Sequence, residues 1–135
     1  MRGRARNPLE GLTVLLVDDN HDQLDMLTAV LSFHGARVVS ADDAKRALGQ
    51  LDEAVIDVIV SDIAMPGFSG LDFIRAVRRR EAGRNIPAIA VTAFILAEPR
   101  EAALAAGFQV YLPKPVDLGH LVDEILRLTR RAGPT

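Results

Sequence analysis

The sequence lacks cysteine and has no long hydrophobic run. Without cysteine, neither a disulfide framework nor a thiolate metal site can form, and a reducing compartment is favoured. The longest apolar stretch, IPAIAVTAFILA, is interrupted by Pro87 and Thr92 and is well short of the roughly 18 residues that a membrane span requires. No apolar signal-peptide core follows the arginines at the N-terminus. We therefore expect a cytoplasmic protein that makes no membrane contact through this domain.

The sequence also lacks a strong excess of either charge. It has 16 Lys and Arg against 18 Asp and Glu, a formal net charge of -2, so we expect no general attraction to nucleic acid or to an anionic membrane. With 135 residues, 49% of them hydrophobic, the chain is long enough for one domain with a buried core. We predict a flexible N-terminal arm over 1–10, one folded domain over 11–131 and a C-terminal tail over 132–135.

Short β-branched runs alternate along the chain with longer segments of helical period. This alternation predicts an α/β fold with helices on both faces of a parallel sheet. The predicted strands are residues 13–17, 37–40, 55–61, 88–92 and 109–112. The predicted helices are residues 20–35, 41–53, 71–80, 98–107 and 117–131. Asn20 and Asp117 are predicted caps, and the basic run Arg78–Arg80 is interpreted as complementing the negative end of a helix dipole.

Polar side chains follow four of the predicted strands. Asp18 and Asp19 follow the first strand, Asp62 the third, Thr92 the fourth and Lys114 the fifth. The carboxyl ends of parallel strands meet at one edge of the sheet, where open α/β folds bind ligands. Adjacent carboxylates repel one another, and their hard oxygens suit Mg²⁺. Each residue alone also fits a helix cap or a solvated turn, but together they predict phosphoryl chemistry.

Four motifs, LLVDDN, VIVSDIAMPGFSGLD, AIAVTA and YLPKPVD, resemble in order and spacing those of the receiver domain of two-component response regulators. The resemblance extends over about residues 12–130. Within that family, the chain most resembles the C-terminal receivers of hybrid sensor histidine kinases. The resemblance implies a doubly wound, flavodoxin-like fold with a five-stranded parallel sheet of order 2-1-3-4-5.

The resemblance also implies a role for each polar residue at the strand ends. Asp62 would be the phosphoacceptor, attacking a phosphohistidine in line to give an acyl phosphate. Asp19 and Asp62 would bind Mg²⁺ directly, the backbone carbonyl of Ala64 would add a ligand, and Asp18 would act mainly through a bound water. Lys114 would pair with the Asp62 region and with a phosphoryl oxygen.

Thr92 and Tyr111 resemble the switch residues of the family. Thr92 would hydrogen-bond a phosphoryl oxygen, and Tyr111 would turn inward into the space that Thr92 vacates. The surface formed by residues 98–107, 109–112 and 117–131 would then change, and it is the expected output face for a homodimer or a downstream protein. The peptide bond between Lys114 and Pro115 is expected to be cis.

Two residues are expected to govern how long the phosphoryl group persists. Ala64 and Phe94 lie two positions after Asp62 and Thr92, where the resemblance places the path of the hydrolytic water. Neither side chain can hydrogen-bond that water, so the orientation that speeds hydrolysis is missing. The phosphorylated form is therefore expected to be long-lived.

The expected partner is a sensor histidine kinase or a histidine phosphotransfer domain. The domain would catalyse its own phosphorylation and dephosphorylation without being a turnover enzyme, whether it stands alone or belongs to a hybrid kinase. One alternative is an interaction module that works without phosphate. Another is a hydrolase of the haloacid dehalogenase type, but that family has a second acid two residues after an early nucleophile, whereas Asp62 is followed by Ala64 and Asp18 by Asn20.

Overall fold

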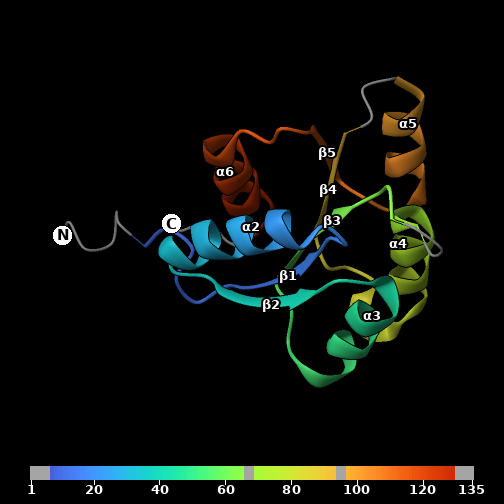
Figure 1. Cartoon of the computed structure of the whole chain (residues 1–135). Helices are drawn as coiled ribbons and strands as arrows, with labels where there is room; N and C mark the ends of the chain where they lie inside the picture. The colour runs from blue at the N-terminus through green and yellow to red at the C-terminus, as the bar shows by residue number, and fades with distance from the viewer. Residues whose placement is uncertain (1–6, 66–68, 94–96, 130–135) are drawn as a thin grey trace.

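Five parallel strands form a single sheet in the order β2-β1-β3-β4-β5 (Figure 1). The computed structural model describes residues 7–65, 69–93 and 97–129. The strands are β1 (Thr13–Val17), β2 (Arg37–Ala41), β3 (Val58–Asp62), β4 (Ala88–Thr92) and β5 (Val110–Pro113). The predicted α/β class and strand order are confirmed.

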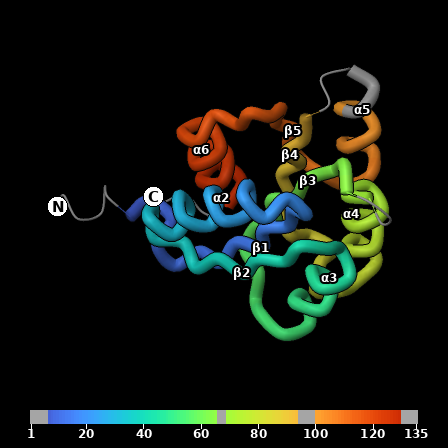
Figure 2. Tube along the Cα trace, in the orientation of Figure 1, coloured from blue at the N-terminus to red at the C-terminus, as the bar shows by residue number. Residues whose placement is uncertain are grey.

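Helices cover both faces of this sheet (Figures 1 and 2). They are α2 (His21–Phe33), α3 (Ala44–Glu53), α4 (Gly70–Arg79), α5 (Ala97–Ala106) and α6 (Leu118–Thr129), with a short 3₁₀ turn η1 (Glu81–Gly83). Residues of α2 and α6 share one buried apolar cluster with the sheet, and residues of α3, α4 and α5 share the other. Because the sheet is covered on both faces, the central strands β3 and β4 are buried along their whole length.

The helix boundaries follow from side-chain caps that the sequence supplies. The predicted caps are confirmed, because the side chain of Asn20 accepts a hydrogen bond from the N–H of Gln23 at 2.9 Å and that of Asp117 accepts one from the N–H of His120 at 3.0 Å. The helix predicted from residue 41 begins at Ala44 instead. Residues up to Ala41 belong to β2, and Asp43 caps α3.

The third strand begins three residues later than the predicted 55–61 and includes Asp62. Val55 is apolar but 84% exposed, since it lies in the turn that leads from α3 to the sheet. The chain joins the sheet at Asp57, just before β3. The carboxylate of Asp57 accepts a hydrogen bond from the N–H of Thr13 at 2.7 Å, and its own N–H donates to the carbonyl of Thr13. The fifth strand is likewise displaced by one residue from the predicted 109–112.

The folded part begins before the predicted boundary at residue 11. Leu9 is fully buried in the cluster shared by α2 and α6, and its N–H donates to the carbonyl of His34 at 2.9 Å. An apolar side chain that fills the core ties its backbone to the domain, so the predicted arm over 1–10 is too long by at least the segment around Leu9. Residues 1–6 and 132–135 lie outside the described residues.

Arg78 has a wider role than the predicted complement to a helix end. Its half-buried guanidinium donates to the carbonyl oxygens of Gly83 at 2.8 Å, Ile86 at 2.7 Å and Gly107 at 2.7 and 3.1 Å. These carbonyls belong to η1, the approach to β4 and the turn after α5. A single side chain of α4 therefore joins the two segments that follow it in the chain to the turn after α5, which is distant in sequence.

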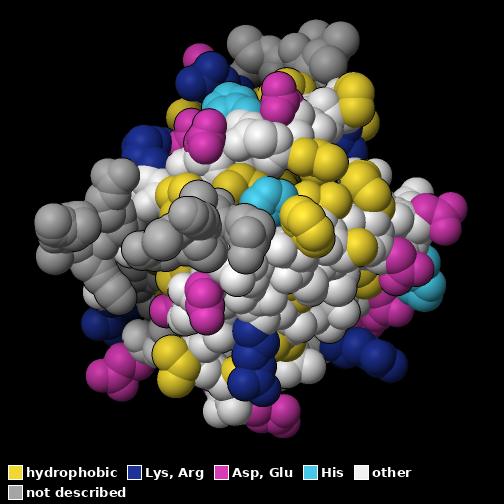
Figure 3. Space-filling view, turned by 90° about the vertical axis from the view of Figure 1, so that its left-hand side faces the viewer, with side chains coloured by type: hydrophobic (Ala, Val, Ile, Leu, Met, Phe, Trp, Pro, Cys, Tyr) yellow, Lys and Arg dark blue, Asp and Glu magenta, His cyan; other side chains and the backbone are white. Residues whose placement is uncertain are grey.

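No helix in the described ranges has both the length and the apolar character that crossing a membrane requires. Apolar side chains do gather on the face seen in Figure 3, beside a histidine. Phe33, at the C-terminal end of α2, is 79% exposed and meets the ring of His34 edge-on at a centroid distance of 5.6 Å.

Candidate functional site

Three carboxylates lie together at the carboxyl edge of the sheet. Asp18 and Asp19 follow β1, Asp62 ends β3, and one oxygen of each lies within 4.8 Å of the others. Asp18 and Asp62 are only 2% and 7% exposed, whereas Asp19 is exposed. The predicted carboxylate cluster is thus present, with two members in the protein interior and one at its surface.

Lys114 brings the single ammonium group of the cluster. Its Nζ lies 3.2 Å from Oδ2 of Asp18 and 3.2 Å from Oδ2 of Asp62. The second oxygens of these carboxylates accept backbone hydrogen bonds, from the N–H of Asn20 at 2.9 Å and from the N–H of Ala64 at 3.2 Å. The loops after β1 and β3 therefore fix the orientation of both buried acids.

The charges in this cluster are unbalanced. Burial raises the pKa of Asp62; the ammonium of Lys114 opposes that rise, and the neighbouring charge of Asp18 adds to it. Burial alone would lower the pKa of Lys114, but the carboxylates of Asp62 and Asp18 outweigh it and raise that pKa. Three carboxylates with one ammonium leave a net negative site built of hard oxygens, which fits a divalent cation such as Mg²⁺.

The ends of β4 and β5 meet the same edge. Thr92 is fully buried at the end of β4, and its carbonyl accepts a hydrogen bond from the N–H of Lys114 at 2.7 Å. That bond continues the ladder between the two strands by one residue and sets the start of the Lys114 side chain beside Thr92. The Lys114–Pro115 peptide bond is cis, as predicted.

Three further residues of the predicted site are Ala64, Tyr111 and Phe94. Tyr111 is opposite Ala90 in the β4–β5 register and is partly buried against the apolar cluster of α3, α4 and α5. Ala64 lies two residues after Asp62, and its backbone N–H donates a hydrogen bond to the carboxylate of Asp62. Phe94 lies outside the described residues.

Gly70 also belongs to this site, although the family resemblance assigned it no role. It is the first residue of α4, and its N–H donates to the carbonyl of Ile63 at 2.9 Å. A Cβ at this position would lie 2.2 Å from the carbonyl oxygen of Asp62 and 2.6 Å from Cα of Ile63. The helix can approach the backbone of Asp62 this closely only without a side chain.

The sequence of this chain matches a known protein family. The sequence model of the family described as "Response regulator receiver domain" matches residues 14–126. The chain belongs to the response regulator receiver family. It is therefore a receiver domain of the two-component signalling systems, as the resemblance of its motifs predicted.

Relatives of this receiver differ in length and setting. An uncharacterised 14.6 kDa protein of Leptolyngbya boryana is 44% identical over 109 residues, which is 81% of this chain and 83% of that protein. Sensor histidine kinase GacS of Pseudomonas protegens is 33% identical over 128 residues, which is 90% of this chain. The receiver spans only 14% of the length of GacS.

A solved receiver domain of a sensor histidine kinase shares the fold of this chain. The receiver domain of sensor histidine kinase PA1611 from Pseudomonas aeruginosa is 34% identical, with a TM-score of 0.82 over 88% of this chain and 98% of that one. That structure is described as having a magnesium ion coordinated in the active site cleft.

Proposed function

We propose that this receiver accepts a phosphoryl group on Asp62 from a phosphohistidine of a sensor histidine kinase or of a phosphotransfer domain. The observation that carries the proposal is the buried Asp62 carboxylate, held by the N–H of Ala64 and by Lys114 beside two further acids. Receivers work with such histidine-bearing partners, and this chain has the full set of groups.

In the proposed reaction, a carboxylate oxygen of Asp62 forms a bond to phosphorus while the phosphorus–nitrogen bond to the donor imidazole breaks. The electron pair of that bond stays on the imidazole. Lys114 loses part of its contact with Asp62 and gains a phosphoryl oxygen as partner, which keeps the positive charge where negative charge gathers. The hydroxyl of Thr92 donates a hydrogen bond to another phosphoryl oxygen.

The residues that would hold Mg²⁺ are Asp19 and Asp62 directly, Ala64 through its carbonyl and Asp18 through a water. When bound, the ion neutralises the phosphoryl oxygens as they approach the acidic site. The clustering of three carboxylate oxygens within 4.8 Å supports this ligand set, as does the magnesium ion in the PA1611 receiver.

Asp19→Asn is expected to weaken Mg²⁺ binding far more than Thr92→Val, because only Asp19 is a charged ligand. Titration of each variant with Mg²⁺ measures the two affinities.

We assign the signal output to Thr92 and Tyr111. Movement of Thr92 toward the phosphoryl group would let Tyr111 turn inward and change the face formed by α5, β5 and α6. Support comes from the position of Tyr111 on β5, next to the strand that ends in Thr92. The partner of this face is a second copy of the chain or a downstream protein.

The phosphorylated form is proposed to be long-lived, because Ala64 and Phe94 offer no hydrogen bond to a hydrolytic water. The double variant Ala64→Asn/Phe94→Glu restores polar groups at both positions and is expected to lose phosphate faster. A decay time course of the purified phosphoprotein in Mg²⁺ measures the difference. Equal decay of the variant and the wild type contradicts the water-positioning argument.

Labelling with acetyl phosphate and Mg²⁺ tests the function directly. The wild type is expected to gain one phosphoryl group and Asp62→Asn none, because an amide of the same shape is a poor nucleophile. Base-labile phosphate on Asp62→Asn would rule out Asp62 as the acceptor. A wild type that gains no phosphate and no change in shape would instead favour the interaction module that works without phosphate.

A further inference from the structure

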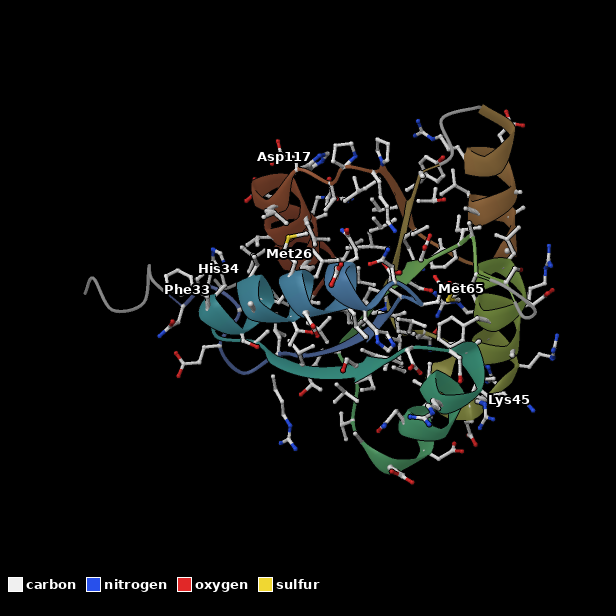
Figure 4. The ribbon with its side chains drawn as sticks, in the orientation of Figure 1. Met26, Phe33, His34, Lys45, Met65 and Asp117 are labelled. Atoms are coloured by element: carbon white, nitrogen blue, oxygen red, sulfur yellow. The ribbon has the colours of Figure 1, made fainter. Side chains whose placement is uncertain are left out.

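A hollow opens on the surface beside the carboxylate cluster. Its volume is about 460 Å³, and it lies between the start of α3 and the loop after β3. Asp19 lines one side of it, so the hollow and the proposed metal site share a residue. Lys45 on α3 and Met65 on the loop line it as well, and Figure 4 shows both on the same side of the molecule, away from Phe33.

The hollow has an apolar floor and a charged rim. Ala44, Leu48 and Met65 provide the floor; Ala44 and Met65 are buried and Leu48 is partly buried. Exposed Lys45 stands at the rim, and exposed Asp19 stands at the side toward the site. An apolar centre enclosed by charged side chains is the anatomy of a protein–protein contact.

The position of Asp62 determines what approaches this hollow. Because the phosphoacceptor is only 7% exposed, a donor imidazole must enter the mouth between the strand ends to reach it. The surface around that imidazole then covers the rim of the mouth, which includes Asp19. The hollow begins at Asp19, so it lies under the same surface of the donor protein.

We infer that the hollow receives an apolar side chain of the protein that carries the phosphohistidine, one that lies next to the histidine on the donor surface. This inference rests on the proposed function, and it adds a contact that binds and orients the donor without taking part in the chemistry. A small donor has no side chain that reaches the hollow. The two classes of donor should therefore respond differently when the hollow is changed.

Two variants change the hollow in different ways, one at its floor and one at its rim. Leu48→Glu places a charge in the apolar floor, whereas Lys45→Trp, at an exposed position, covers the hollow with a bulky ring. Phe33→Glu is the matched control, because it also replaces an apolar side chain with Glu but at the far end of α2, about 18 Å along the helix from its start. Lys45→Trp decides the outcome if Leu48→Glu does not fold.

Each variant is phosphorylated by two probes: acetyl phosphate, and the autophosphorylated core of a sensor histidine kinase chosen because it transfers phosphate to the wild type. Both hollow variants are expected to lose about tenfold or more of the transfer rate from the kinase. Their rates with acetyl phosphate should stay within about twofold of the wild type, and Phe33→Glu should match the wild type with both probes.

Several results would overturn the inference. Unchanged kinase transfer in both variants shows that no donor side chain uses the hollow, and equal losses with both probes show that the variants act on the Asp62 site itself. A change in oligomeric state with unchanged transfer assigns the hollow to a second copy of the chain. If acetyl phosphate labels Asp62 but no kinase does, the hollow has no such occupant; if acetyl phosphate fails as well, the proposed function fails.

Discussion

Gly70→Ala is predicted to impair phosphorylation of Asp62 through the backbone alone. The new Cβ would lie 2.2 Å from the carbonyl oxygen of Asp62 and 2.6 Å from Cα of Ile63, whereas ordinary contacts begin at 3.4 Å. Both neighbours are backbone atoms, so neither can turn aside. The end of β3 and the start of α4 must separate by about 1 Å, and a misplacement of that size costs on the order of 100-fold in rate when it reaches a reacting group.

The stability cost of the same substitution is smaller. Overpacking of this kind lowers the free energy of unfolding by about 1–3 kcal/mol, which leaves most molecules of a domain of ordinary stability folded. The loss of labelling should therefore appear in folded protein. The rate of labelling by acetyl phosphate in Mg²⁺, followed by mass spectrometry, and urea unfolding of the same preparation measure the two effects separately.

Gly49→Ala is the matched control for this prediction. Gly49 lies inside α3, and a Cβ there would meet no atom within 4 Å. The Gly49→Ala substitution should stabilise the protein by about 0.5–1 kcal/mol, since alanine is the better helix former. It should leave the labelling of Asp62 unchanged. A Gly70→Ala variant that is labelled within twofold of the wild type would refute the reasoning, as would a loss no greater than its unfolded fraction.

Two further predictions concern charge and stability. Burial raises the pKa of Asp62 in the folded state above its ordinary value of 3.8, so ionisation of this carboxylate destabilises the fold increasingly as the pH rises from the ordinary pKa to the raised one, and fully above it. Without Mg²⁺, Asp62→Asn should therefore be more stable than the wild type at pH 7. Urea unfolding at a series of pH values should show this advantage shrinking as the pH falls below the raised pKa and vanishing near the ordinary one. A difference that is constant with pH contradicts this. Arg78→Met should lower the free energy of unfolding by about 2 kcal/mol, because carbonyls of three segments lose a charged donor. The control Arg79→Met, at an exposed position, should change it by no more than about 0.5 kcal/mol. Equal effects of the two variants in thermal unfolding would show that the Arg78 hydrogen bonds contribute little.

The parts of the structure that the sequence predicts are those set by local pattern and by topology. β1 and β4 have the predicted bounds, because each apolar run ends at a polar residue. The meeting of Asp62 and Lys114 was predicted from a rule about where parallel strands end. It did not require any knowledge of their side-chain positions.

The remaining features depend on distances that one sequence does not contain. The need for glycine at Gly70 arises from the approach of α4 to the backbone of Asp62, and no pattern of neighbouring residues reveals it. Val55 is a β-branched residue of the type that favours strands, but it lies outside the sheet. Leu9 precedes the first strand, and its burial depends on the packing of α2 and α6.

The guanidinium of Arg78 has a mechanical consequence for the proposed output face. It ties the turn at Gly107, where α5 ends, to the end of α4 and to the approach to β4. The lower end of α5 is therefore anchored, while its upper end lies at the edge of the sheet that carries the carboxylates (Figure 1). We therefore expect a displacement that starts at that edge to tilt α5 about Gly107, with an amplitude that is largest at the end of the helix near the site and smallest at the anchored turn.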